Sequence, residues 1–260
     1  MKIAITAGGT YEKIDEVRAI SNSSTGILGA EIAKAFLALP EVEKIVYISG
    51  RHAIKPPASE RVEEVKVANV SSLEAAVRNA IYGGMDAAVF SMAVSDYTVE
   101  AATTLDRIAD FVSKSASAQA NAARFDVKEA LQKALSDEEG FDRSHKISSG
   151  LDSLVLNLKP TPKVIGIARD LAPEMVIVGF KLMDRPAHQE LIDTAKRLMD
   201  KNRADYVFAN DKAEVTYENH AGYLLSTDGT YVRLEGRAAI ARAIASGVTA
   251  LVHERKEKAK

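Results

Sequence analysis

The 260-residue chain contains no cysteine. This absence excludes disulfide bonds and every zinc site built from thiolates. The five histidines show neither HExxH nor HxH spacing. We therefore expect no metal ion that is held by protein side chains alone.

The sequence also lacks an excess of charge of either sign and any long apolar run. Lys and Arg total 34 against 36 for Asp and Glu, for a net charge of -2. This balance offers no basic surface for nucleic acid or for an anionic membrane, so we expect neither as a partner. No apolar run reaches the roughly 18 residues of a membrane span. Met1 leads directly into a strand-like run without the pattern of a signal peptide, which predicts a cytoplasmic location.

Short runs of β-branched residues alternate with helical patterns along most of the chain. This alternation is typical of βαβ units around a mostly parallel sheet. The predicted strands are residues 2–7, 44–48, 62–67, 87–92, 175–179 and 206–209, and the predicted helices are residues 26–39, 71–82 and 188–202. We predict an α/β protein with one domain over residues 1–260, in which helices flank a Rossmann-like sheet in three layers.

Two segments depart from this alternation. Residues 100–145 are rich in Ala, Ser and charged residues, and amphipathic patterns over 104–114 and 125–135 predict a helical insertion or lid. Residues 222–234 predict a β-hairpin around a Thr-Asp-Gly turn. Such a hairpin is a candidate dimer contact, although a plain edge hairpin fits the same pattern.

A glycine-rich turn follows the first predicted strand. Gly8 and Gly9 allow the backbone to approach a ligand closely, and together with Thr10 they can point amide N–H groups at an anion. The turn matches neither GxGxxG nor GxxxxGK[ST]. Phosphate binding and an ordinary tight turn therefore both remain open.

Polar residues gather just before the second predicted element. Ser24 or Thr25 can cap the following helix and Gly26 keeps its first turn open, so that the helix N-terminus favours a phosphate or carboxylate. Arg18 can add a bidentate clamp. Asn22 has no capping duty, and its amide is suited to hold a carbonyl or acyl oxygen. The alternative is a well-capped helix with solvated polar residues.

Further candidates lie at later strand ends, where open α/β sheets bind ligands. Asp96 can hydrogen-bond a base or a sugar, or serve as a turn aspartate. Phe180 can stack on a base or pack in the core. Lys201 can reach phosphates or lie on a solvated helix face, and Asn210 ends a buried strand. Pro162 predicts a helix that opens with proline in its first turn and leaves its N-terminus free.

Six motifs in this order make the chain resemble phosphopantothenate–cysteine ligase, in particular the stand-alone form. The resemblance runs from Met1 to about Asp211. The motifs are ITAGGT, DxVRxISNxSxGxxG, AVSDY, KISS with the following LxLxLKPTPKVI, VGFKL and KNxADYVFAND. One motif recurs by chance, but six in order hardly do.

The resemblance implies a single ligase domain that acts in coenzyme A biosynthesis. It implies that 4'-phosphopantothenate and L-cysteine are joined through an acyl-nucleotidyl intermediate, with release of pyrophosphate and a nucleoside monophosphate. CTP is the nucleotide that the resemblance favours over ATP. Mg2+ is expected to arrive with the triphosphate, held mostly by phosphates and water. A homodimer is also implied.

The resemblance also assigns residues. Asn22 matches the position that handles the intermediate, and Lys146, which by itself reads as a surface lysine, matches a lysine paired with the nucleotide phosphates. The positions expected at the nucleotide are Gly8, Gly9, Thr10, Phe90, Ser91, Met92, Asp96, Lys146, Pro162, Lys163, Val164, Ile165, Phe180 and Lys201. The positions expected at the other substrate are Arg18, Asn22, Ser24, Thr25, Gly26 and Asn210.

Some features depart from the family pattern. The chain has KISS and FKLM where fused bacterial enzymes commonly have KIKK and FAAET. The basic residue that reaches the triphosphate therefore stays open among Lys181, Lys196, Arg197 and Lys201. The choice between CTP and ATP and the role of residues 100–145 stay open as well.

Two other functions compete with a ligase. An NAD(P)-dependent Rossmann oxidoreductase can also place glycines such as Gly26 and Gly29 before a helix. The common short-chain reductases, however, need Tyr with Lys four residues on, which none of the eight tyrosines has. A non-catalytic nucleotide-binding protein is the second alternative, and in it Asn22 and Lys146 would be dispensable.

Overall fold

The computed structural model describes residues 1–118, 125–216 and 219–258. The chain forms two compact units. The first unit comprises Met1–Thr10, Asn22–Val94 and Lys163–Lys260, and the second comprises Tyr11–Ser21 and Ser95–Pro162. The segment 100–145, predicted as an insertion into a single domain, thus belongs to the second unit.

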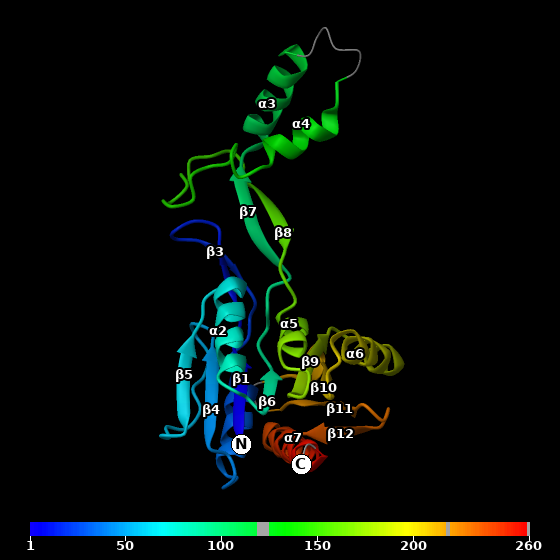
Figure 1. Ribbon diagram of the computed structural model, residues 1–260. Helices are drawn as coiled ribbons and strands as arrows, with labels where there is room; N and C mark the ends of the chain where they lie inside the picture. Colours follow the sequence, from blue (N-terminus) through cyan, green and yellow to red (C-terminus); the bar gives the residue numbers. More distant parts are fainter. Residues whose placement is uncertain (119–124, 217–218, 259–260) are drawn as a thin grey trace. The chain divides into compact units, whose positions relative to one another are not determined.

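The first unit is built on an eight-stranded sheet with the order β12-β11-β10-β9-β6-β1-β4-β5 (Figure 1). Strands β1, β4, β5, β6, β9 and β10 run parallel, and the β11–β12 hairpin adds two antiparallel strands. The strands are β1 (Lys2–Ala7), β4 (Lys44–Ser49), β5 (Val62–Lys66), β6 (Ala87–Phe90), β9 (Val176–Met183), β10 (Tyr206–Asp211), β11 (Ala221–Ser226) and β12 (Tyr231–Glu235). The predicted α/β class and mostly parallel sheet are confirmed.

Helices cover both faces of this sheet. Alternate strand residues enter two cores, so that Ile3 and Ile5 of β1 face one side and Ala4 faces the other. One core is completed by α1 (Ile27–Leu37) and α7 (Arg237–Lys258), and the other by α2 (Val70–Tyr82), α5 (Val164–Leu171) and α6 (His188–Asn202). Burial on both faces explains why these strands appear as nearly continuous apolar runs in the sequence.

The order of the strands reverses next to β1. The chain passes from β1 to β4 and β5 on one side, and α2 then returns it to β6 on the other side. Ligands of open α/β sheets bind beyond the carboxyl ends of the strands at such a reversal. The topology therefore points to the residues that follow β1 and β6.

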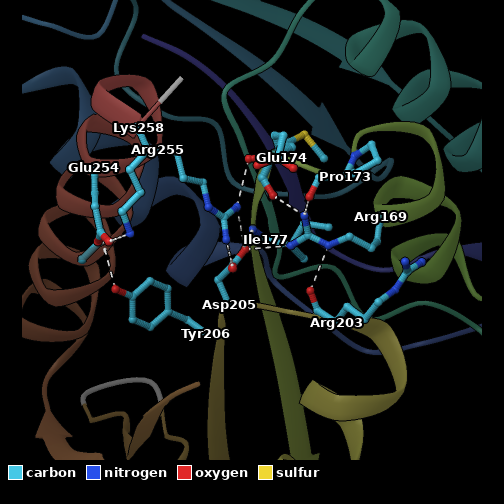
Figure 2. A network of polar contacts seen from close by, with 12 residues as sticks. Arg169, Pro173, Glu174, Ile177, Arg203, Asp205, Tyr206, Glu254, Arg255 and Lys258 are labelled. Carbon is cyan, nitrogen blue, oxygen red and sulfur yellow. Dashed lines mark hydrogen bonds and ion pairs between the residues drawn. The ribbon is translucent and has the colours of Figure 1, made fainter. Parts of the chain in front are cut away.

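Two aspartates tie α7 to the opposite, amino-terminal ends of the strands, and Figure 2 shows the network around one of them, Asp205. Asp205 lies just before β10 and accepts bonds from the Ile177 amide at 2.7 Å and from Arg169 Nη2 at 2.8 Å. Its other oxygen accepts a bond from Arg255 of α7. Asp86 lies just before β6 and repeats the arrangement, because it binds the amide of Lys2 and the ammonium group of Lys256.

The second unit contains two antiparallel pairs of strands and two helices. Strands β2 (Tyr11–Lys13) and β3 (Ala19–Ser21) form one pair, and β7 (Tyr97–Thr103) and β8 (Val155–Pro160) form the other. Helices α3 (Leu105–Ala118) and α4 (Val127–Ala134) agree with the two predicted amphipathic segments, 104–114 and 125–135. Residues 119–124, which connect the two helices in the sequence, lie outside the described part. Strands β2, β3 and β7 were not predicted, because runs of three residues carry no readable period and the first half of β7 is polar.

The longest helix of the described chain, α7, has 22 residues. Its charged residues are Arg237, Arg242 and the run from Glu254 to Lys258. Among the described residues, no helix has both the length and the apolar character that crossing a membrane requires.

Candidate functional site

The glycine-rich turn lies at the carboxyl end of β1, where the strand order reverses. Gly8 has a φ of 85°, a left-handed conformation that favours glycine. Its carbonyl oxygen accepts a hydrogen bond from the Ala93 amide at 2.8 Å, and the Thr10 amide donates to the Ala93 carbonyl oxygen at 3.1 Å. The turn therefore continues the parallel pairing of β1 with the residues that follow β6.

Asn22 lies directly beside this turn. Its amide donates to the Thr10 carbonyl oxygen at 3.2 Å. A Cβ atom on Gly9 would lie 2.1 Å from the Asn22 carbonyl oxygen, and one on Gly50 would lie 2.4 Å from the Gly9 carbonyl oxygen. Three backbone segments meet here, and this contact is a sufficient reason for glycine at position 9. Binding of phosphate by Gly8 and Gly9 stays a prediction.

Helix α1 begins against the same turn. Its N-cap is Gly26, with a φ of 71°, and a Cβ atom there would lie 3.0 Å from the Gly8 nitrogen. The N-cap residue is thus neither Ser24 nor Thr25, as predicted, but Gly26, which has no side chain to make a capping bond. Thr25 still contributes to the cap, because its Oγ1 accepts a long hydrogen bond of 3.5 Å from the Ile27 amide. The following amides of the first turn are suited to an anion.

The residues that follow β6 fasten the turn from the other side. Ser91 Oγ donates to the Thr6 carbonyl oxygen at 2.6 Å, and the Met92 amide donates to Thr6 Oγ1 at 3.2 Å. A Cβ atom on Gly29 would lie 2.9 Å from Ser91 Oγ, so α1 approaches both strands closely. Phe90 is partly buried and ends β6. The structure thus brings Phe90, Ser91 and Met92 to the predicted site.

Two further predicted residues lie on β9 and β10. The Phe180 ring packs 5.7 Å from the Phe208 ring, as the core interpretation predicted. Asn210 is buried, and its Nδ2 lies 3.2 Å from His220 Nε2. Burial lowers the pKa of His220 to about 4, so the imidazole is neutral at pH 7 and can accept a bond from the Asn210 amide. His220 thereby orients a predicted site residue, a role that was not predicted from the sequence.

Helix α5 begins later than predicted. Lys163 is its N-cap and Val164 its first residue, which makes the prediction of proline in the first turn wrong. The reason lies in the second unit, where the Thr161 amide donates to the Asp96 carbonyl oxygen at 3.0 Å and Thr161 Oγ1 donates to the Ser95 carbonyl oxygen at 2.6 Å. These bonds keep Thr161 and the following Pro162 outside the helix.

Lys201 is not brought to the other residues of the first unit. It lies in the last turn of α6, which leads into the amino end of β10, whereas Asn210 lies near the carboxyl end of that strand. A parallel βαβ connection places Lys201 at the amino-terminal ends of the strands and Asn210 at their carboxyl-terminal ends. The placement does not support the prediction that Lys201 reaches the same phosphates.

The second unit holds the remaining predicted residues. Asp96 and Lys146 are exposed. Arg18 is half-buried and forms a 2.5 Å ion pair with Asp15, so its guanidinium group is already engaged within this unit. The hydrogen bond from the Arg18 side chain holds the pKa of the Asp15 carboxyl well below its usual range. No role was predicted for Asp15, although the sequence contains its Asp-x-x-Arg spacing to Arg18.

A site held by protein ligands for a metal ion does not emerge from the described residues. No group of three or more His, Asp or Glu side chains among them is arranged to hold one.

Comparisons with known proteins agree with the motifs. Residues 1–110 match the family described as the DNA/pantothenate metabolism flavoprotein C-terminal domain. The chain is 30% identical over 210 residues to the coenzyme A biosynthesis bifunctional protein CoaBC of Methanocaldococcus jannaschii, a match that covers 81% of this chain and 40% of that protein. It is 28% identical over 232 residues to CoaBC of Thermococcus kodakarensis, which covers 87% of this chain and 45% of that protein. The chain thus spans less than half the length of these curated relatives.

A solved structure matches nearly the whole chain. The DNA/pantothenate metabolism flavoprotein of Streptococcus pneumoniae superposes with a TM-score of 0.80 at 29% identity, which covers 96% of this chain and 99% of that one. The likeness therefore includes the second unit and the C-terminal hairpin as well as residues 1–110.

Proposed function

We propose that this protein joins 4'-phosphopantothenate to L-cysteine in coenzyme A biosynthesis, because residues 1–110 match the family described as the DNA/pantothenate metabolism flavoprotein C-terminal domain. The observation that carries the proposal is the position of Asn22, which is held by its backbone beside Thr10 at the strand-order reversal. The names of the CoaBC relatives support the same pathway. They favour a ligase over the NAD(P)-dependent oxidoreductase alternative.

The proposed reaction has two steps. The substrate carboxylate attacks the α-phosphorus of a nucleoside triphosphate, the bond to the β-phosphate breaks, and pyrophosphate leaves. The cysteine amine then attacks the acyl carbon, loses a proton and expels the nucleoside monophosphate, which forms the amide. Such catalysis depends on positioning and on neutralising charge.

Two side chains carry these steps in the proposal. The Asn22 amide holds the acyl oxygen of the intermediate, while the exposed ammonium group of Lys146 neutralises the triphosphate. The amides at the start of α1, where the N-cap Gly26 makes no side-chain bond, suit an anionic group of the substrates. The oriented amide of Asn210 adds a polar contact at the end of β10.

We further propose CTP as the nucleotide, with Mg2+ carried by its phosphates and by water. Mg2+ usually keeps several waters and binds substrate phosphates together with few protein groups, which is the basis for expecting it with the triphosphate. The base would contact the backbone of Phe90, Ser91 and Met92 and the start of α5 at Lys163, Val164 and Ile165. Backbone groups can distinguish cytosine from adenine by their pattern of donors and acceptors.

A homodimer through the C-terminal hairpin completes the proposal. Strand β12 is an edge of the eight-stranded sheet, so one side of its backbone has no strand partner in the sheet. Tyr231 and Val232 of this strand are 44% and 51% exposed. An edge with exposed apolar side chains is suited to pair with a second copy.

A turnover assay tests the function. Purified protein is incubated with phosphopantothenate, Mg2+ and either CTP or ATP, and pyrophosphate release is measured with and without cysteine. We expect turnover with CTP. Absence of turnover with both nucleotides would contradict the ligase proposal, and turnover with ATP alone would contradict the choice of CTP.

Two variants test the residue roles in the same assay. Asn22→Ala should allow pyrophosphate release but slow amide formation, whereas Lys146→Ala should slow the first step. The matched controls are Asn79→Ala and Lys128→Ala, which change exposed residues of α2 and α4. If the Asn22 and Lys146 variants keep the rates of their controls, the roles are wrong even when the wild type is active.

A further inference from the structure

The segment of the second unit that carries Lys146 has a distinctive burial pattern. Ile147 is 5% exposed, whereas Lys146 and Ser148 on either side are exposed. Adjacent side chains point in different directions, so insertion of Ile147 into the unit keeps Lys146 turned toward solvent. Bonds that fix the backbone of Ile147 also fix the neighbouring Cα atom, from which the Lys146 side chain extends.

The turn between β2 and β3 fixes that backbone on both sides. The Ile147 amide donates to Asp15 Oδ2 at 3.1 Å, and the Ile147 carbonyl oxygen accepts a bond from Arg18 Nη2 at 2.9 Å. Asp15 and Arg18, three residues apart, therefore satisfy both backbone polar groups of the buried residue Ile147. An apolar residue held in this manner has little freedom to shift along the chain or to rotate.

Asp15 and Arg18 are themselves held in place. Asp15 is 1% exposed, and its Oδ1 accepts bonds from the amides of Val17 at 2.8 Å and Arg18 at 2.7 Å. Its Oδ2 accepts bonds from Arg18 Nε at 2.9 Å and Nη2 at 2.5 Å. The pair is thus organised without a ligand, and the Asp15 carboxylate is almost fully shielded from solvent.

Arg143 fastens the same segment at its other end. Its Nε donates to the Ile14 carbonyl oxygen at 3.0 Å, and its Nη1 donates to the carbonyl oxygens of Val99 at 2.9 Å and Glu100 at 2.8 Å. Lys146 therefore lies between two points of attachment, one at Arg143 and one at Ile147. Of these two attachments, the one at Ile147 is adjacent to Lys146 in the sequence.

We propose that Asp15 is a positioning residue for the proposed ligase reaction, which holds Lys146 in place through Ile147, with Arg18 as its partner. The inference rests on the proposed role of Lys146 at the triphosphate. It assigns Arg18 to this clamp rather than to direct contact with a substrate. A lysine whose backbone is already fixed loses less conformational entropy when it binds the phosphates, which favours the first step.

Proteolysis tests the clamp without any reference to activity. Trypsin can cut the bond between Lys146 and Ile147 only when the segment opens locally. Asp15→Asn should raise the rate of this cut about tenfold, the factor expected for loss of a hydrogen bond to a charged group. The site of cutting is identified by mass spectrometry of the folded protein. The matched control is Glu16→Gln, an exposed residue of the same turn that pairs with Lys13.

The rate of pyrophosphate release tests the positioning role. Asp15→Asn should lower kcat of the first step, and the double variant Asp15→Asn/Lys146→Ala should be no slower than Lys146→Ala alone, because the clamp acts through Lys146. Glu16→Gln should keep the wild-type rate. A purely structural role would give additive effects in the double variant instead.

The outcomes separate this inference from the proposed function. An inactive wild type contradicts the ligase, while the trypsin assay still tests the clamp. An active wild type with an unchanged Asp15→Asn variant, or additive losses in the double variant, overturns the inference. If Asp15→Asn does not fold, Arg18→Lys, which keeps the charge but loses the paired bonds to Asp15 and Ile147, is tested in its place with the same outcomes.

Discussion

At the residue scale, glycine at position 9 is required by a contact with backbone and not by a turn alone. The Asn22 carbonyl oxygen occupies the space that any side chain at position 9 would need. Backbone atoms cannot give way as a flexible side chain can, so the substitution has to move the segment that carries Asn22.

Gly9→Ala should therefore lower both stability and amide formation. We expect a loss of about 1–3 kcal/mol in the free energy of unfolding, as for other overpacked sites. Denaturant unfolding measures the stability, and the cysteine-dependent step of the turnover assay measures the displacement of Asn22. Gly166→Ala is the control, because a Cβ atom there meets only ordinary van der Waals contact inside α5. Equal behaviour of the two variants would contradict the prediction.

His220 makes stability depend on pH. Its pKa is about 4 in the folded protein against 6.5 for the free side chain. Below pH 6.5 the His220 side chain binds a proton in the unfolded chain but stays neutral in the folded protein until about pH 4. The free energy of unfolding therefore falls from pH 6.5 to about pH 4, and His220 causes no change above pH 6.5. The full loss is about 3 kcal/mol.

His220→Gln should flatten this part of the stability profile. Glutamine does not titrate, and its side chain can still face Asn210. Denaturant unfolding from about pH 7.5 to about pH 4.5, a range that covers the titration of histidine, gives the slope of stability against pH for the wild type and for the variant. His52→Gln, at an exposed position, should keep the wild-type slope. A His220→Gln profile as steep as that of the wild type would show that other groups cause the acid sensitivity.

At the scale of elements, α7 is held to the sheet by charge as well as by apolar contact. Asp205 receives bonds from α5, α7 and the neighbouring strand β9 (Figure 2). The side chain of Arg169 is only 5% exposed, so it depends on this carboxylate for compensation of its charge. Removal of one member of such a buried group leaves the others without a partner of opposite charge.

Asp205→Ala should cost about 3 kcal/mol or more in the free energy of unfolding. It leaves Arg169 buried without its counter-ion and the Ile177 amide without its acceptor. Thermal and denaturant unfolding measure the loss. Asp170→Ala removes an ion pair with Arg203 whose side chains are 71% and 61% exposed, and it should cost less than about 1 kcal/mol. Losses of similar size in both variants would argue against the buried network.

At the scale of the whole molecule, the proposed dimer depends on the exposed edge of β12. Val232→Lys places a charge on that edge and should shift the protein toward monomer, as edge lysines do in natural sheets. Sedimentation equilibrium measures the change. Val127→Lys is the control, because Val127 of α4 is 52% exposed against 51% for Val232. A wild type that is monomeric, or a Val232→Lys variant with an unchanged dimer, would contradict the hairpin interface.

The sequence by itself determined the elements of the first unit and the family resemblance. Period and composition suffice for β1 and α6, whose bounds agree with the prediction, because an apolar strand or an amphipathic helix carries its pattern locally. Motifs such as the glycine turn and the Asn22 segment are likewise contiguous. Their phosphate and acyl contacts remain predictions.

Only the tertiary structure decided which residues meet. The contact of Gly9 with Asn22, the bond of His220 to Asn210 and the clamp of Asp15 on Ile147 join residues that no local pattern connects. The same holds for Lys201, which lies at the C-terminal end of α6 and therefore at the amino-terminal ends of the strands, opposite to Asn210. These arrangements depend on strand order and on buried hydrogen bonds, and those form only when distant segments of the chain pack together.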